Sequence, residues 1–252
     1  MKLLTKGKSL VLAYDQGLEH GPVDFTDENI NPEYILDIAK KGKYNGIILQ
    51  KGIAEKYYRN EAPLILKLNG KTSIYKGEPI SLQLCSVKEA LDLGAKAVGY
   101  TIYMGSKYEP KMLNEFGKIQ EEAHNYKIPV IAWMYPRGSS VKKVTPEIIA
   151  YGARVGLEIG ADFVKVHYTG SLQSFKKVVE AAGKCKVLCA GGHKKNDLEI
   201  LKETKEVMST GAVGMAIGRN IWQHKEPLKI TKALKKIIFD NSSVKDALKK
   251  LR

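Results

Sequence analysis

A lysine stands inside an otherwise apolar segment, residues 163–168, whose sequence is FVKVHY. If this segment is a strand, its alternation sends the two valines to one face and Lys165 and His167 to the other. The valines suit contact with a helix layer, so Lys165 should point inward, where an ammonium is costly unless it is paired or its pKa falls. A lysine of lowered pKa can form a Schiff base, because only the neutral amine attacks a carbonyl. The alternative is a lysine whose charge is neutralised by an inward carboxylate.

The same alternation places an acid and a phenol on inward faces. Asp15 ends one apolar run, and Tyr135 ends another, two residues after Trp133. A Schiff-base aldolase needs an amine, a proton shuttle for carbinolamine dehydration, and an acid or base at the carbon being broken. We therefore predict that Lys165, Tyr135 and Asp15 are catalytic. Trp133 would line the substrate site, and the alternative for both Tyr135 and Trp133 is aromatic packing over the barrel mouth.

Glycine-rich turns follow the last two apolar runs. The first turn contains Gly191 and Gly192, and the second contains Gly218 and Arg219. Barrel enzymes often hold a phosphate with the loops after strands seven and eight. Glycines let backbone N–H groups approach the anion, and an arginine adds charge-assisted donors. The two turns therefore predict a phosphate site.

Two other turns are candidates for the far end of a longer substrate. Arg137 directly follows the Tyr135 segment, and His20 lies in the loop of residues 15–22. Each turn contains a proline and a glycine, so simple turn formation is the alternative for both.

Short apolar runs alternate with amphipathic segments, which is typical of βαβ units and a parallel sheet. The expected strands are residues 9–15, 46–50, 64–68, 97–103, 129–135, 163–168, 186–190 and 213–217. The expected helices are residues 32–41, 87–93, 110–126, 146–159, 171–181, 195–209 and 226–238, with a short basic helix in the tail at 241–252 and left-handed caps at Gly42, Gly94, Gly160, Gly183 and Gly211. Eight strands in 252 residues favour a (β/α)₈ barrel over a doubly wound sheet. No linker is visible, so residues 1–252 should form one domain.

The net charge of +14 fits nucleic acid, anionic metabolites or a solvated lysine-rich surface. Many lysines alternate with glutamates in amphipathic segments such as residues 198–206, which favours exposed helix faces. Asp15 cuts short the apolar run near the start of the chain, and no run approaches the roughly 18 apolar residues of a membrane helix. We expect a cytoplasmic protein with neither nucleic acid nor membrane as a partner.

The cysteines and histidines predict neither disulfides nor a metal. Cys85, Cys185 and Cys189 form no C-x-x-C pair and are expected to be buried thiols. The five histidines show no close ligand spacing. No metal is therefore expected, and the Schiff base predicted on Lys165 needs no other cofactor.

Taken in order, these motifs resemble the archaeal-type class I fructose-1,6-bisphosphate aldolases, the family named after DhnA. The resemblance covers most of the chain, and the motifs that carry it are Asp15-Gln16-Gly17-x-x-His20-Gly21-Pro22, Trp133-x-Tyr135-Pro136-Arg137-Gly138, Asp162-x-Val164-Lys165 with Tyr168-Thr169-Gly170, Ala190-Gly191-Gly192 and Gly218-Arg219.

The resemblance implies a metal-independent lyase of glycolysis and gluconeogenesis. Lys165 would attack C2 of open-chain fructose 1,6-bisphosphate, and the iminium would accept electrons as the C3–C4 bond breaks. Glyceraldehyde 3-phosphate would leave first, and dihydroxyacetone phosphate after enamine protonation and hydrolysis. By the same resemblance Tyr135 is the main proton donor and acceptor, and Asp15 assists carbinolamine formation and breakdown.

The resemblance also assigns Trp133 to the wall of the site and the C1 phosphate to the two glycine turns with Arg219. It implies a homo-oligomer, often a decamer. The family also contains 2-amino-3,7-dideoxy-D-threo-hept-6-ulosonate synthase, which would use the same lysine in aromatic amino-acid synthesis and remains the alternative. Trp133 two residues before Tyr135 favours the aldolase.

Overall fold

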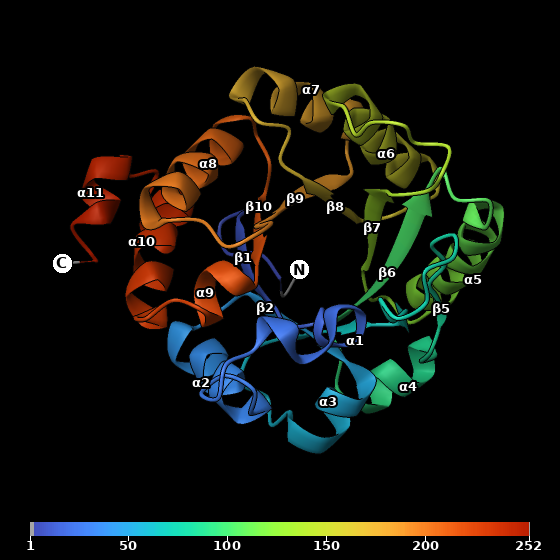
Figure 1. The fold of residues 1–252 in the computed structure, drawn as a ribbon, viewed down its shortest axis with the longest axis horizontal. Coiled ribbons are helices and arrows are strands. Elements are labelled where there is room, and N and C mark those ends of the chain that lie inside the picture. The colour runs from blue at the N-terminus through green and yellow to red at the C-terminus, as the bar shows by residue number, and fades with distance from the viewer. Residues whose placement is uncertain (1–2, 252) are drawn as a thin grey trace.

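The computed structural model describes residues 3–251, in which eight parallel strands close into a barrel (Figure 1). The strands follow the order β1-β10-β9-β8-β7-β6-β3-β2 around the barrel. The predicted (β/α)₈ barrel is confirmed, and each strand begins and ends within two residues of its predicted limits. The barrel strands are β1 (Ser9–Ala13), β2 (Gly46–Gln50), β3 (Leu64–Lys67), β6 (Ala97–Met104), β7 (Val130–Pro136), β8 (Phe163–His167), β9 (Lys186–Ala190) and β10 (Gly214–Ile217).

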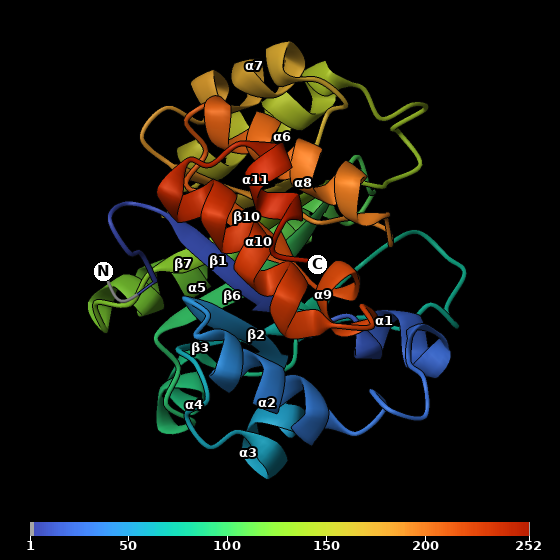
Figure 2. The same ribbon diagram turned by 90° about the vertical axis from the view of Figure 1, so that its left-hand side faces the viewer.

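Helices form a ring around the strands, as Figures 1 and 2 show. The helices predicted between strands all form, and they are α2 (Pro32–Gly42), α4 (Val87–Asp92), α5 (Glu109–Asn125), α6 (Pro146–Glu158), α7 (Leu172–Ala182), α8 (Asp197–Ser209) and α10 (Pro227–Asp240), with α11 (Val244–Leu248) in the tail. Several short elements were not predicted, namely α1 (Gly17–His20), the 3₁₀ helix η1 (Gly21–Asp24), α3 (Lys51–Tyr57), α9 (Arg219–Trp222) and a hairpin of β4 (Asn69–Gly70) with β5 (Leu82–Gln83).

One predicted helix cap was wrong. Gly94, Gly160, Gly183 and Gly211 have positive φ, but at the end of α2 it is Lys43 that adopts the left-handed conformation. Gly42 is still helical, and a Cβ added there would lie 2.4 Å from Cε2 of Tyr44. The glycine is therefore explained by close packing against this ring and not by the cap.

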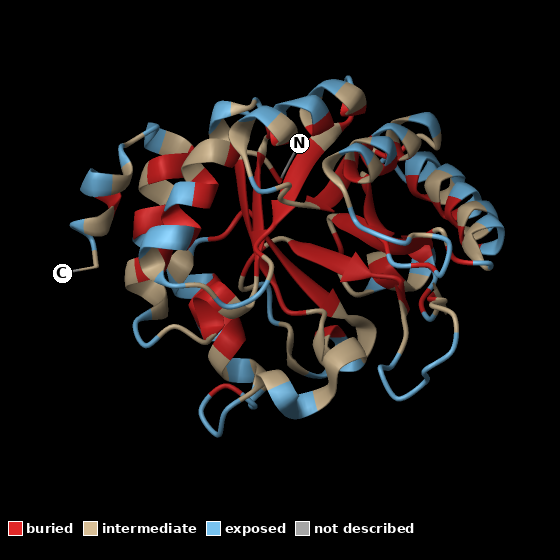
Figure 3. Cartoon of the chain, turned by 45° about the horizontal axis from the view of Figure 1, so that its top comes forward, coloured by how far each residue is buried: buried red, intermediate tan, exposed pale blue. Residues whose placement is uncertain are grey.

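The barrel strands are buried along almost their whole length (Figure 3). Side chains of β8 divide as predicted: Val164 faces α6, where a Cβ on Gly156 would lie 2.1 Å from its Cγ1, and Lys165 lines the interior. Inside the barrel the ring of Trp133 lies over Gly99, where a Cβ would come within 1.8 Å of it. A glycine on β6 thus makes room for the tryptophan on β7. No helix within residues 3–251 combines the length and the apolar character needed to cross a bilayer.

Candidate active site

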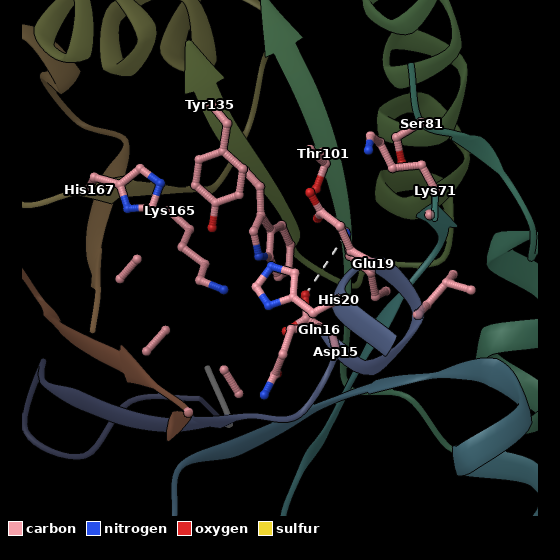
Figure 4. A pocket seen from close by; sticks show the side chains of 18 of the residues that line it. Asp15, Gln16, Glu19, His20, Lys71, Ser81, Thr101, Tyr135, Lys165 and His167 are labelled. Atoms are coloured by element: carbon pink, nitrogen blue, oxygen red, sulfur yellow. Dashed lines mark ion pairs between the residues drawn. The ribbon is translucent and has the colours of Figure 1, made fainter. Parts of the chain in front are cut away.

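A cavity opens where the strands end and the chain enters the following loops (Figure 4). The structure brings all ten residues that we predicted from the sequence to its wall: Asp15, His20, Trp133, Tyr135, Arg137, Lys165, Gly191, Gly192, Gly218 and Arg219. Tyr135, Lys165 and His167 enter from one side, and Asp15, Glu19 and His20 face them from the side of α1. The sequence motifs, scattered over more than 200 residues, therefore meet in one place.

Lys165 is buried, with 6% of its surface exposed, and carries its amine to the centre of the cavity. Within residues 3–251, no carboxylate lies within ion-pair distance of Nζ, which instead lies 5.0 Å from the centroid of the Trp133 ring. Burial lowers the pKa of Lys165, and the field of Asp15 opposes this only in part. The alternative considered for Lys165, that an inward carboxylate neutralises its charge in an ion pair, therefore does not fit this structure.

Tyr135 lies beside Lys165 and is held by two neighbours. Its ring stacks on the imidazole of His167, with centroids 4.7 Å apart and an interplanar angle of 19°. The guanidinium carbon of Arg137 lies 5.0 Å from the Tyr135 centroid. Burial and the charge of Asp15 raise the pKa of Tyr135 well above its ordinary value, so the free site holds a neutral phenol ready to donate its proton.

Asp15 has a partner that the sequence analysis missed. Lys67, the last residue of β3, places Nζ 3.8 Å from Oδ2 of Asp15. Nζ of Lys67 also lies 5.4 Å from the centroid of the Trp133 ring, so the amines of two buried lysines lie near the same indole ring. Lys67 ends the run Leu64-Ile65-Leu66-Lys67, and the reasoning that identified Lys165, a charge in an apolar strand, applies equally to it.

Short helices after β1 add charged residues at the rim of the cavity. Glu19 of α1 accepts a hydrogen bond from Arg137, with Oε1 2.7 Å from Nη1. His20 Nδ1 lies 2.7 Å from Oδ2 of Asp24, whose other oxygen lies 3.5 Å from Nη1 of Arg219. The predicted arginines thus both approach carboxylates of the β1–α2 connection.

The two glycine turns are joined by a buried amide. Asn220 accepts a hydrogen bond from the backbone N–H of Lys195 at 2.7 Å and donates to the carbonyls of Gly191 at 3.0 Å and His193 at 2.8 Å. Gly192 has a φ of 68°, a conformation that favours glycine. The turn after β9 is therefore fixed relative to Arg219 by the residue next to it in sequence.

We expect Asn220→Asp to weaken binding of phosphorylated substrates more than it slows turnover. A carboxylate there faces two carbonyl oxygens, so two hydrogen bonds are lost and the turn after β9 moves. We expect a KM increase of roughly tenfold or more and a loss of roughly 2–4 kcal/mol in the free energy of unfolding. Steady-state kinetics and urea unfolding measure these effects. Asn196→Asp is the control, because an aspartate can replace Asn196 as the N-cap of α8. An unchanged KM in Asn220→Asp would contradict the proposal that Asn220 holds the turn after β9.

Two further histidines and the three cysteines lie away from this chemistry. His124 pairs with Asp162 on the outside of the barrel, and His224 pairs with Asp197 before α10. Within the described residues, no three or more His, Cys, Asp or Glu side chains gather as a metal site would require. Cys85, Cys185 and Cys189 are buried free thiols, as predicted.

Comparison with known proteins places the chain among aldolases. The profile of the DeoC/LacD family aldolases matches residues 9–224. The class 1 fructose-bisphosphate aldolase of Thermoproteus tenax is 49% identical over 247 residues, which cover 96% of this chain and 94% of the relative. A fructose-bisphosphate aldolase/6-deoxy-5-ketofructose 1-phosphate synthase of Methanocaldococcus jannaschii is 40% identical, covering 98% and 87%. A solved archaeal fructose-1,6-bisphosphate aldolase, with its catalytic lysine covalently bound to the carbinolamine intermediate, superposes with a TM-score of 0.90 at 48% identity, covering 94% of this chain and 96% of that one.

Proposed function

The chain belongs to the DeoC/LacD family of aldolases, and from this premise we propose that Lys165 is the lysine on which its substrate forms a Schiff base. The enzyme is a class I fructose-bisphosphate aldolase, a lyase that reversibly cleaves fructose 1,6-bisphosphate into two triose phosphates. The observation that supports the assignment to Lys165 is its amine, which is buried in the cavity, has no ion-pair partner among the described residues and has a lowered pKa. Such an amine supplies the neutral nucleophile that carbinolamine formation requires.

Tyr135 is suited to shuttle one proton through the whole cycle. Its neutral phenol protonates the hydroxyl that leaves C2 as water, and the tyrosinate so formed is stabilised by the adjacent iminium cation. The tyrosinate then accepts the proton of the C4 hydroxyl as the C3–C4 bond breaks and its electron pair moves to the iminium, giving the enamine and the aldehyde. Returning that proton to C3 of the enamine regenerates an iminium for hydrolysis. Asp15 assists the proton transfers of carbinolamine formation and breakdown.

The glycine turns are suited to anchor the substrate by its C1 phosphate. Gly191, Gly192, Gly218 and Arg219 line the cavity beside β8 and β1, next to the amine of Lys165. An anchored phosphate holds C2 in reach of Nζ and removes most of the entropic cost of orienting the ketone. Arg137 and His20, which also line the cavity, are our candidates for the far end of the substrate, and Trp133 for the wall between.

Borohydride trapping tests this assignment. The enzyme is incubated with fructose 1,6-bisphosphate, with and without EDTA, then reduced and digested for mass spectrometry. We expect a substrate-dependent adduct on the peptide containing Lys165, unaffected by EDTA, together with release of both triose phosphates. An adduct without triose release would keep the lysine chemistry and favour the heptulosonate synthase reaction. The absence of any adduct would overturn the Schiff base.

We also propose the broader setting of the enzyme. Phosphorylated sugars are charged and stay within the cytoplasm, so a cytoplasmic enzyme fits this substrate. Residues 1–252 are proposed to act as one domain, with no cofactor beyond the covalent lysine, no nucleic acid and no membrane as partners. Exposed apolar side chains such as Ile74 and Tyr151 suit contacts between copies in a homo-oligomer, a decamer being the expectation. Light scattering after gel filtration measures the number of copies.

A further inference from the structure

Lys67 is a second buried lysine in the cavity, and the steps proposed for Lys165, Tyr135 and Asp15 do not use it. It is 6% exposed, ends β3 and lines the same cavity as Lys165. Burial lowers its pKa to about 8, with Asp15 opposing the shift and Lys165 adding to it. At neutral pH it is therefore mostly charged, in contrast to the neutral amine that a nucleophile requires.

The surroundings of Lys67 leave its N–H donors available. Among residues 3–251 its one ion-pair partner is Asp15, and the 3.8 Å between Nζ and Oδ2 exceeds the roughly 2.7–2.9 Å of a charge-assisted hydrogen bond. Among residues 3–251 no oxygen lies close enough to accept a hydrogen bond from this ammonium, which lies 5.4 Å from the centroid of the Trp133 ring. A buried ammonium without hydrogen-bond acceptors is costly, and a substrate oxygen in the cavity would satisfy it.

The barrel order indicates which part of the substrate reaches Lys67. Around the eight strands, β3 stands opposite β9, with three strands between them on either side. The glycine turn after β9 is the proposed site of the C1 phosphate, and Lys165 on the adjacent β8 takes C2. A substrate anchored there extends across the lumen toward β3, which brings the carbons beyond C3 toward Lys67.

We propose that the ammonium of Lys67 donates a hydrogen bond to O4 of the substrate and stabilises the negative charge that develops on O4 during C3–C4 cleavage. This role rests on the proposed Schiff-base function. As the bond breaks, its electron pair moves to the iminium on Lys165 and the O4 proton passes to the Tyr135 phenolate. Lys67 keeps its own proton throughout, and in the reverse direction it polarises the aldehyde carbonyl. Removing one such donor typically lowers kcat by about 10²–10³-fold.

Half-reactions distinguish this role from others. Dihydroxyacetone phosphate has no C4, yet it forms the Schiff base and exchanges a C3 hydrogen with solvent. In Lys67→Met we expect the borohydride adduct of dihydroxyacetone phosphate on Lys165 and its deuterium exchange to stay within about threefold of wild type. Cleavage and aldol addition should both fall by roughly 10²–10³-fold. The retained adduct also shows that the variant is folded, and Lys96→Met, at the other end of the neighbouring strand β6, controls for loss of a lysine.

Lys67→Arg supplies the second readout, because a guanidinium stays charged where an amine does not. We expect wild type to lose kcat/KM for cleavage above about pH 8, as Lys67 deprotonates. In Lys67→Arg part of the cleavage activity should return and this alkaline loss should move to higher pH. Equal losses of exchange and cleavage in Lys67→Met would overturn the proposal and make Lys67 a positioning residue for Asp15. Unchanged cleavage would also overturn it, whereas a missing Lys165 adduct in wild type would overturn the Schiff-base function itself.

Discussion

Replacing Lys165 by methionine is expected to abolish cleavage of fructose 1,6-bisphosphate and to stabilise the fold. Without the amine no carbinolamine forms, so kcat/KM should fall by roughly 10⁴–10⁶-fold and no borohydride adduct should appear. The stabilisation follows from burial, because a buried amine with no ion-pair partner within residues 3–251 is exchanged for an apolar chain of similar length. We expect a gain of roughly 1–3 kcal/mol in the free energy of unfolding at neutral pH.

The sign of the pH dependence follows from the lowered pKa of Lys165. Between that value and the ordinary lysine pKa of about 10.4, the unfolded chain binds more protons than the folded one, so this lysine makes stability rise with pH. The advantage of Lys165→Met is therefore largest below the lowered pKa and disappears above the ordinary one. Urea unfolding of both proteins across this pH range measures it.

Lys186→Met is the matched control for both effects. Lys186 begins the neighbouring strand β9, and its amine lies over the ring of Phe163 outside the cavity. We expect this variant to keep its activity and its Lys165 adduct. A Lys165→Met enzyme that still formed an adduct, or that lost stability, would contradict the proposed nucleophile or the absence of a partner.

The alternation of apolar runs with amphipathic segments was sufficient to predict the barrel, and the alternation of side chains within strands predicted several of the residues that line its interior. In β8 the period of two separates the valines from Lys165, and the same rule brings Asp15, Trp133 and Tyr135 inward. It would also have identified Lys67, the only charge in its run, had the rule been applied to β3. Which lysine Asp15 pairs with could not be predicted, because that depends on distances of a few ångströms across the lumen.

Short helices and contacts between distant residues produce no periodic pattern in the sequence, so they could not be predicted from it. Helix α1 has four residues, too few to show helical periodicity, yet it brings Glu19 to Arg137. Asn220 joins two turns that lie some 25 residues apart, and nothing about an isolated asparagine indicates its partners. The helix caps show the same limit, since Gly42 follows the pattern of a cap while contact with Tyr44 is what requires the glycine.

Tyr135→Phe is expected to lower kcat by roughly 10²–10⁴-fold while leaving the site assembled. Phenylalanine keeps the stacked ring against His167 and the packing of a buried side chain, and it removes only the hydroxyl. Both carbinolamine dehydration and C3–C4 cleavage then lack their proton carrier. Because the pKa of Tyr135 is raised, wild type carries the phenol throughout the neutral range, so the loss should not depend on pH there. Steady-state kinetics from pH 6 to 9 measure this.

Tyr103→Phe is the control that tests whether the position of the Tyr135 hydroxyl matters. Tyr103 is also buried, lines the same cavity and lies 5.8 Å from the guanidinium carbon of Arg137, and burial raises its pKa as well. If any buried hydroxyl in this cavity could carry the proton, Tyr103→Phe and Tyr135→Phe would lose similar amounts of activity. If position beside Lys165 decides, Tyr103→Phe should cost less than about tenfold, since it loses at most one hydrogen bond to the substrate. A larger loss in Tyr103→Phe than in Tyr135→Phe would move the proton shuttle from β7 to β6, while Lys165 would keep its role as the nucleophile.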